Sequence, residues 1–439
     1  MTVVSYSLGP TADQLESRIR QHRPLELPAA WANEVLFPYY NGLSIRNVPH
    51  TIAQLLGVPL PGNAPLDGMV WDSHPLEGNI QRVVVFLSDG LGYLRLKQAI
   101  EQDTELQETV ARLTDGRGPV PLTSTAPSTT CTALPTLWTG RGPISHGLVA
   151  TRLYLREVGA LSHILHYRPV ASKRKDTLLE WGLQPETFIP GATLGEILGH
   201  AHIPSRVVVT DGIQGSNLSQ IIYRGVGERI VHGGYSDTWS RIHQVLEATA
   251  GQKCYVHIYW EAVDTLSHLH GSHHEWLTRE IKRQLSDIHV VLNSPSVQDG
   301  QTLVMIVADH GHHNVSENIM LHQDERAAPI WNASRGGLGG ETRLGYLYLR
   351  DGYKQQVIDT VERNFSDCLT WIEPEAAIQS GLFGPETPYI ESIHRLGDLI
   401  LVPRLNYRLG DHLRPLVAQS LHGGLSEWEM MVPLMWKVI

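Results

Sequence analysis

Residues 302–314 read Thr-Leu-Val-Met-Ile-Val-Ala-Asp-His-Gly-His-His-Asn, and this stretch decides the fold class. Leu303–Val307 is an unbroken apolar run rich in branched side chains, which predicts a buried parallel strand. The run leads into Asp309-His310-Gly311. Open α/β sheets bind ligands at the carboxyl ends of their strands, and a carboxylate and an imidazole can both hold a divalent metal. The stretch therefore predicts an α/β fold with a metal site at the end of a central strand.

Two more apolar runs end in the same way. Arg82–Ser88 is followed by Asp89, and Cys254–Trp260 is followed by a segment that contains Asp264 and His268. If that segment is helical, Asp264 and His268 lie on one face, because they are four residues apart. Asp89 either caps the helix predicted over 93–100 or binds a metal. Near the end of the chain, His422-Gly423-Gly424 predicts a turn before an apolar strand.

A group of hydroxyl residues precedes another predicted helix. Ala126-Pro-Ser-Thr-Thr-Cys-Thr reads as a loop that enters a helix, which Thr139-Gly140 ends. A hydroxyl at a helix start serves either as an N-cap or as a nucleophile, since the free N–H groups there favour a phosphate. Together with the three carboxylates and three imidazoles, one hydroxyl between 128 and 132 suffices for two metal ions about 4 Å apart. A single ion would need only three or four of these ligands.

Composition excludes several functional classes. The 439 residues carry a formal net charge of −10, which argues against binding to nucleic-acid polymers or anionic membranes. No apolar run is long enough to span a membrane, and residues 1–6 do not begin a secretory signal. The three cysteines provide no disulfide framework and favour a reducing, cytoplasmic location.

The remaining segments are less informative. We expect residues 1–80 to pack on the body as an extension, and 81–439 to form the catalytic domain, with cap-like insertions around 150–200 and 312–400. Gly336–Gly340 predicts a flexible loop, and 173–175 is a basic run that either faces solvent or contacts a substrate phosphate. We expect His312, His313 and His322 to line the surface or the cap rather than to bind metal.

With these motifs in order, the chain resembles the alkaline phosphatase superfamily, in its type I phosphodiesterase/nucleotide pyrophosphatase branch. Asp89 matches an Asp at a strand end, and residues 127–130 match Pro-Thr-x-Thr, in which the second Thr is the nucleophile. The distances to Thr139-Gly140 and His146-Gly147 select Thr130 for that role. Asp264-Thr-Leu-Ser-His268 matches Asp-x-x-Gly-His, with Ser267 in place of Gly. Residues 309–311 match the Asp-His-Gly of the family's Ser-Asp-His-Gly motif, and residues 422–423 match its late His-Gly pair.

The resemblance implies a three-layer α/β/α sandwich with a mostly parallel central sheet and a smaller cap. It implies two divalent metal ions, for which zinc suits the ligands and manganese is used by some relatives. One ion would take Asp264, His268 and His422. The other would take the set Asp89, Asp309, His310 and the Thr130 oxygen. Thr130 would attack a small-molecule phosphoester and form a covalent phosphothreonyl intermediate.

Two positions depart from the branch. Thr151 stands where an Asn often contacts a phosphoryl oxygen, and Cys131-Thr132-Ala133 replaces Phe-Pro-Asn after the nucleophile. Both bear on the preference for diesters. The alternatives are a phosphomonoesterase, a phosphonate hydrolase or a sulfatase on the same fold, or a binding protein without catalytic activity. The sulfatase signature Cys/Ser-x-Pro-x-Arg is not present around residue 130.

Overall fold

A computed structural model describes residues 7–25, 31, 34–71, 76, 79–411 and 418–439 of the chain. The start of the chain, for which the sequence predicts no secretory signal, lies at residues 1–6, outside the described residues. Parts of the predicted extension, 26–30, 32–33, 72–75 and 77–78, also lie outside them. The boundary at residue 80 stays a prediction.

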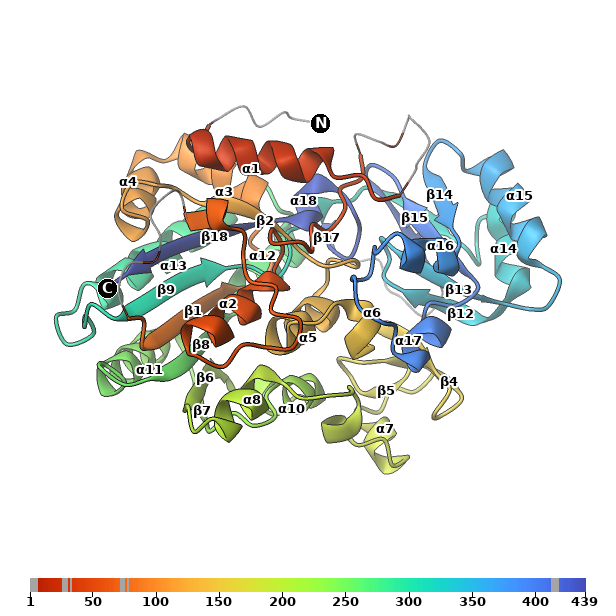
Figure 1. The fold of residues 1–439 in the computed structure, drawn as a ribbon. Coiled ribbons are helices and arrows are strands. Elements are labelled where there is room, and N and C mark those ends of the chain that lie inside the picture. Colours follow the sequence, from red (N-terminus) through yellow and green to blue (C-terminus); the bar gives the residue numbers. More distant parts are fainter. Residues whose placement is uncertain (1–6, 26–30, 32–33, 72–75, 77–78, 412–417) are drawn as a thin grey trace.

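A seven-stranded sheet forms the centre of the larger lobe (Figure 1). In spatial order its strands are β2 (Val120–Thr123), β18 (Met431–Val438), β9 (Thr302–Val307), β1 (Arg82–Ser88), β8 (Cys254–Trp260), β6 (Ser205–Thr210) and β7 (Glu228–His232). β1 pairs in parallel with β8 and β9, and β18 runs antiparallel to both of its neighbours. The predicted mostly parallel sheet is confirmed, and the bounds predicted for β1 and β8 are those observed.

Helices cover both faces of this sheet (Figure 1). One layer holds α3 (Tyr93–Gln102), α4 (Thr104–Leu113) and α13 (Glu275–Leu292); α4 contacts both other helices, and α3 and α4 contact β18. The other layer holds α2 (Asn47–Leu55), α5 (Thr130–Thr139), α8 (Leu194–His200) and α10 (Asn217–Ile222), of which α2, α8 and α10 all contact α5. The three-layer α/β/α arrangement is therefore confirmed.

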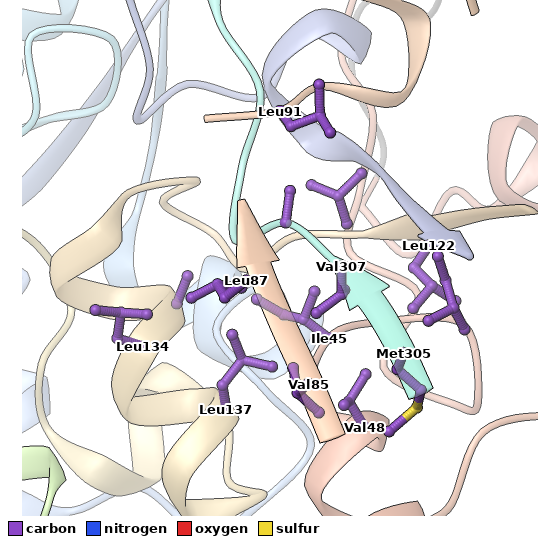
Figure 2. Close-up of a cluster of buried hydrophobic side chains, with 14 of the residues drawn as sticks. Ile45, Val48, Val85, Leu87, Leu91, Leu122, Leu134, Leu137, Met305 and Val307 are labelled. Atoms are coloured by element: carbon purple, nitrogen blue, oxygen red, sulfur yellow. The ribbon is translucent and has the colours of Figure 1, made fainter. Parts of the chain in front are cut away.

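The core beneath the site lies between α5 and the sheet. Figure 2 shows Leu134 and Leu137 of α5 facing Val85 and Leu87 of β1, and all four side chains are buried. Because strand side chains alternate between faces, every second residue of β1 points at α5. Each such leucine or valine contributes about 1.5–3 kcal/mol by leaving water, so the first turn of α5 is held rigidly against the strand ends.

A second sheet forms the smaller lobe. Its order is β14 (Leu369–Ile372), β15 (Leu399–Pro403), β13 (Gly345–Leu349), β12 (Ser334–Gly340), β3 (Arg152–Leu155), β4 (Ala160–His163) and β5 (Arg168–Pro169). Its pairings are antiparallel. Figure 1 shows α14 (Ala328–Ala333) and α15 (Lys354–Asn364) beside it. The two segments predicted as insertions thus contribute strands to a single sheet.

The prediction of a flexible loop at Gly336–Gly340 is wrong, because this segment lies within β12. Leu338 is fully buried, and a Cβ atom on Gly339 would lie 2.7 Å from the Tyr348 ring. The glycines therefore allow close packing rather than loop motion.

The remaining elements tie distant segments together. α1 (Pro10–Gln21) buries Ala12, Leu15 and Ile19 in the main core, and α12 (Ala262–His270) follows β8. A short antiparallel pair joins β10 (His313–Asn314) to β17 (Ser420–Leu421), next to His422. Among the described residues, no helix has the length and apolar character needed to cross a membrane.

Candidate active site

Three neighbouring strands deliver acidic residues to one edge of the central sheet. β1 lies between β8 and β9, with Ser88 level with Trp260 and Leu87 level with Val307. Asp89 therefore emerges between the segment that carries Asp264 and the segment that carries Asp309. The prediction that these strand ends meet at one site rests on the parallel pairing, which the structure shows.

Asp89, Asp309 and His310 form one group of potential metal ligands, with ligand atoms all within 4.8 Å of one another. Asp309 Oδ1 accepts hydrogen bonds from the backbone N–H groups of Gly90 (3.1 Å) and His310 (2.9 Å). Its Oδ2 atom is buried, has no hydrogen-bond partner among the described residues and lies 3.4 Å from His310 Nε2. One oxygen is thus fixed by the backbone, and the other is left for a cation.

Asp89 is arranged in the same way. Its Oδ2 atom accepts a hydrogen bond from the Tyr259 hydroxyl. Its Oδ1 atom is buried without a partner among the described residues and lies 3.4 Å from His310 Nε2. Burial, and then the nearby charges of Asp309 and Asp264, raise the pKa of Asp89 well above its ordinary value. A bound divalent cation would remove this repulsion, so the donor set and the unpartnered oxygens fit a metal.

The His310 ring is oriented for ligation. Its Nδ1–H donates to the Gly311 carbonyl oxygen at 3.1 Å, so Nε2 carries the lone pair that faces the carboxylates. The residue after His310 must be small. A Cβ atom on Gly311 would lie 2.1 Å from the Trp428 carbonyl oxygen, so only glycine lets the backbone pack this closely. Thr130 Oγ1 lies 3.1 Å from the same His310 Nε2.

Asp264 belongs to two further groups, one with His310 and His422 and one with His268 and His312. Its Oδ1 atom lies 3.5 Å from His268 Nε2 and 3.7 Å from His422 Nε2. His268 Nδ1–H donates to the Ser420 carbonyl oxygen at 2.9 Å, which turns Nε2 toward Asp264. The histidine and aspartate clusters are consistent with a binuclear metal site.

The expectation that His312 lines the surface is wrong. Its side chain is 1% exposed, and Nε2 lies 2.8 Å from Asp264 Oδ1. Burial lowers the pKa of His312 to about 4. Burial alone would raise the pKa of Asp264, but the contacts with His312, His268 and His422 outweigh burial and lower it. The sequence 310–313 signals many imidazoles, but it does not tell which of them point inward.

Thr130 begins helix α5. Thr129 is the N-cap residue, and its side chain makes no capping hydrogen bond to the helix. The first N–H groups of a helix have no partner within it, and the helix dipole is positive there. The start of α5 therefore offers donors to an anion beside Thr130.

Thr151 lies next to this helix start. Its hydroxyl oxygen is 3.4 Å from that of Thr129, and its backbone N–H donates to Glu341 Oε1 at 2.6 Å. The structure thus places Thr151 near the predicted nucleophile, on the side of His268 and His422.

Two cavities adjoin the cluster. The first, of about 480 Å³, is lined by Asp89, Thr130 and Asp264 and reaches Lys175. The second, of about 360 Å³, is lined by Thr151, His268 and His422. It also has a basic wall made of His163, Arg168 and Arg408. Leu165 and His166 line both cavities, so the two cavities adjoin at these residues.

Comparison with known proteins agrees with this geometry. The family model described as "Type I phosphodiesterase / nucleotide pyrophosphatase" matches residues 83–424. The chain belongs to this family. It is therefore a hydrolase of the phosphodiesterase/nucleotide pyrophosphatase family, and the resemblance predicted from the sequence is confirmed. No curated protein matches the chain.

Solved structures of the family show the same fold at low identity. Murine ectonucleotide pyrophosphatase/phosphodiesterase 5 matches with a TM-score of 0.60 and 14% identity, over 81% of this chain and 87% of that one. The human protein matches with a TM-score of 0.60 and 15% identity, over 82% and 88%. Phosphonoacetate hydrolase from Sinorhizobium meliloti matches with a TM-score of 0.57 and 16% identity, over 82% and 91%.

The structure brings all of the predicted site residues together at one sheet edge: Asp89, Thr130, Thr151, Asp264, His268, Asp309, His310 and His422. Their roles as nucleophile, metal ligands and substrate contact stay predictions. Sequence reasoning missed His312, Tyr259 and Ser420. Tyr259 lies inside β8 and Ser420 in the two-residue strand β17, and neither carries a local pattern that predicts its contacts.

Proposed function

We propose that this family hydrolase cleaves phosphoric ester bonds with two divalent metal ions and with Thr130 as its nucleophile. The observation that carries the proposal is the position of the Thr130 hydroxyl, 3.1 Å from His310 Nε2 at the start of α5. That imidazole also faces Asp89 and Asp309 at 3.4 Å each. A nucleophilic hydroxyl is thus held against the group that is best suited to hold a cation.

The metal ligands follow from the two halves of the cluster. Asp264, His268 and His422 would hold the first ion. Asp89, Asp309, His310 and the Thr130 oxygen would hold the second. Mixed imidazole and carboxylate donors suit zinc, and manganese is the alternative. When bound, the ions would polarise the phosphoryl oxygens and lower the pKa of the Thr130 hydroxyl.

Thr130 supplies the covalent step. Its hydroxyl gives its proton to solvent, and Oγ1 forms a bond to phosphorus while the bond from phosphorus to the departing oxygen breaks; the departing oxygen takes a proton from solvent. Water then attacks phosphorus, the bond from phosphorus to Thr130 Oγ1 breaks, and Oγ1 regains a proton from that water. N–H groups at the start of α5 stabilise the charge on the phosphoryl oxygens. Murine ectonucleotide pyrophosphatase/phosphodiesterase 5 with a threonine-to-alanine change is inactive, and its structure is known in complex with AMP. This supports a threonine nucleophile.

The cavities favour a substrate with two substituents on phosphorus. One cavity adjoins Thr130 and the other adjoins His268 and His422, so each of two groups on phosphorus has a cavity available. Diesters and nucleotide pyrophosphates have such groups. We therefore propose that the enzyme prefers diesters to monoesters.

A second candidate is hydrolysis of a phosphonate that carries another anionic group. Lys175 in one cavity, and Arg168 and Arg408 in the other, favour a substrate with charge beyond the phosphoryl group. A structural relative is a phosphonoacetate hydrolase in complex with phosphonoacetate, which is such a molecule.

The experiment combines a nucleophile series with a substrate panel. We expect zinc-loaded Thr130→Ala to lose at least about 10³-fold in kcat while it retains two zinc ions, and Thr130→Ser to keep measurable turnover. Undiminished activity of Thr130→Ala would refute the role of Thr130.

The panel compares bis-p-nitrophenyl phosphate, p-nitrophenyl phosphate and phosphonoacetate. A kcat/KM ratio of diester to monoester well above one supports the first candidate, and a ratio well below one refutes the diester preference. Turnover of phosphonoacetate alone selects the second candidate.

A further inference from the structure

We propose that His312 is a direct ligand of the first metal ion, beside Asp264, His268 and His422. The inference rests on the proposed two-metal function and concerns the ligand set of one ion. It starts from a contact between two groups that would both accept a hydrogen bond. His312 Nε2 and Asp264 Oδ1 lie 2.8 Å apart.

The proton positions around His312 follow from its neighbour Ser420. The Ser420 hydroxyl donates its single proton to the Ser267 carbonyl oxygen at 2.6 Å. Its oxygen therefore accepts from His312 Nδ1–H, at 3.1 Å. With the proton on Nδ1, the lone pair on Nε2 points at an ionised carboxylate, which has no proton to donate. In this tautomer no proton lies between the two acceptors, so their 2.8 Å contact fits a metal ion that binds both.

Asp264, His268 and His312 form one group of potential ligands, and the distances from Asp264 to each of the three imidazoles suit a shared ion. Zinc holds nitrogen and oxygen ligands at about 2.0–2.2 Å, so neighbouring donors of a tetrahedral site lie about 3.3 Å apart. Asp264 Oδ1 lies 2.8 Å from His312 Nε2, 3.5 Å from His268 Nε2 and 3.7 Å from His422 Nε2. These separations bracket that value. The three imidazoles therefore converge on one carboxylate oxygen.

His312 is also held in place from behind. A Cβ atom on Gly90 would lie 3.0 Å from His312 Nε2 and 2.8 Å from the Asp264 Cα atom, so the backbone of the β1–α3 loop closes over the contact. Ser420 fixes both His312 and His268, through its side chain and its carbonyl group. A ligand oriented by such partners binds more tightly than a free imidazole.

With His312 the first ion would have four protein donors. Catalytic zinc sites usually have three, and a zinc ion with four would accept a phosphoryl oxygen only as a fifth ligand. We therefore expect the first ion to be held tightly and to exchange slowly. The exchangeable position would belong to the second ion, beside Thr130. The two ions would differ in affinity, and His312 would cause the difference.

The test compares His312→Gln and His312→Ala with His313→Ala. Glutamine can still donate a hydrogen bond to Asp264 but is a poor zinc ligand. His313 is the adjacent imidazole, whose Nδ1 atom contacts Ser426 Oγ at 3.2 Å. Zinc content is measured in a graded series of chelator buffers, and the visible absorption of cobalt-substituted protein reports the ligand number.

We expect wild type and His313→Ala to retain two zinc ions with unequal affinities. Both His312 variants should lose at least about 100-fold in affinity at the tighter site and show an altered cobalt spectrum. Wild-type affinity and an unchanged spectrum in both His312 variants would overturn the assignment. A loss in His312→Ala alone would also overturn it, because it would make His312 a hydrogen-bond donor to Asp264.

If a His312 variant fails to fold, a measurement on the wild-type protein still tests the assignment. NMR couplings in cadmium-substituted wild type count the imidazoles on each ion, and two rather than three at the first site would overturn the assignment. Wild type that binds no zinc would overturn the proposed function as well. If wild type binds two ions and hydrolyses the substrate while His312→Gln keeps both, the assignment of His312 alone fails.

Discussion

The replacement Glu429→Gln tests a buried ion pair behind the loop that carries His422. Arg343 and Glu429 are joined by two hydrogen bonds of 3.1 and 3.0 Å, and their side chains are 2% and 0% exposed. Glu429 also accepts the backbone N–H of Gly424 at 2.8 Å and the Ser426 hydroxyl at 2.6 Å. The pair thus fixes the segment that follows His422.

The expected loss of stability follows from two independent estimates. Although burial alone would raise it, the charge and hydrogen bonds of Arg343 lower the pKa of Glu429 from 4.5 to about 2. A carboxyl group with this change in pKa on folding contributes about 3 kcal/mol. Removing one partner of a buried pair costs about 3–5 kcal/mol. For a chain of this length, 3 kcal/mol corresponds to a Tm decrease of about 3 °C.

The pH dependence has a definite sign. Because folding lowers the pKa of Glu429, its contribution is complete above the ordinary pKa of 4.5 and is lost as the pH falls toward 2. We expect the Tm difference between wild type and Glu429→Gln to be about 3 °C at pH 7 and less than half of that at about pH 3.

The assay is differential scanning calorimetry of metal-free protein, so that metal release does not contribute. Glu427→Gln is the matched control in the same short helix, α18 (Glu427–Met430), because Glu427 pairs with Arg20 at a site where the side chains are 21% and 39% exposed. Such a pair contributes about 0–1 kcal/mol, so its Tm should change by about 1 °C or less. Equal effects of the two variants, or a difference that does not shrink in acid, would refute the reasoning.

Two further predictions concern the site itself. We expect Asp89→Asn to raise the Tm of metal-free protein by about 1–2 °C, because it removes the repulsion among Asp89, Asp309 and Asp264, and to weaken zinc binding in a chelator titration. We expect Gly311→Ala to lower the Tm by about 1–3 °C and to reduce the zinc content below two ions, since a Cβ atom there would lie 2.1 Å from the Trp428 carbonyl oxygen.

The Asp89→Asn and Gly311→Ala predictions each have a matched control. Ser88→Ala changes a buried residue next to Asp89 but removes no charge, so it should not stabilise metal-free protein. Gly336→Ala places a Cβ atom where nothing lies within 4 Å, and it should leave both the Tm and the zinc content unchanged. A metal-free Asp89→Asn protein that is less stable than wild type would contradict the electrostatic account. Wild-type zinc content in Gly311→Ala would contradict the steric one.

The sequence alone determined the strands and the chemistry at their ends. Arg82–Ser88 and Cys254–Trp260 were predicted with their observed bounds, because a short run of branched apolar residues is stable only when it is buried. An acid after each strand then points to one edge of the sheet, since parallel strands end together. This reasoning located Asp89, Asp264 and Asp309.

Only the tertiary structure decided which side chains share that edge. The glycines of β12 resemble a loop in sequence, but in the fold the missing side chain at Gly339 leaves room for the Tyr348 ring of β13. His312 and His313 are adjacent and chemically identical. The β10–β17 pairing, together with Ser420, turns one toward Asp264 and the other toward Ser426. Local pattern encodes burial and strand direction, but the orientation of an imidazole depends on partners more than a hundred residues away, which no local pattern specifies.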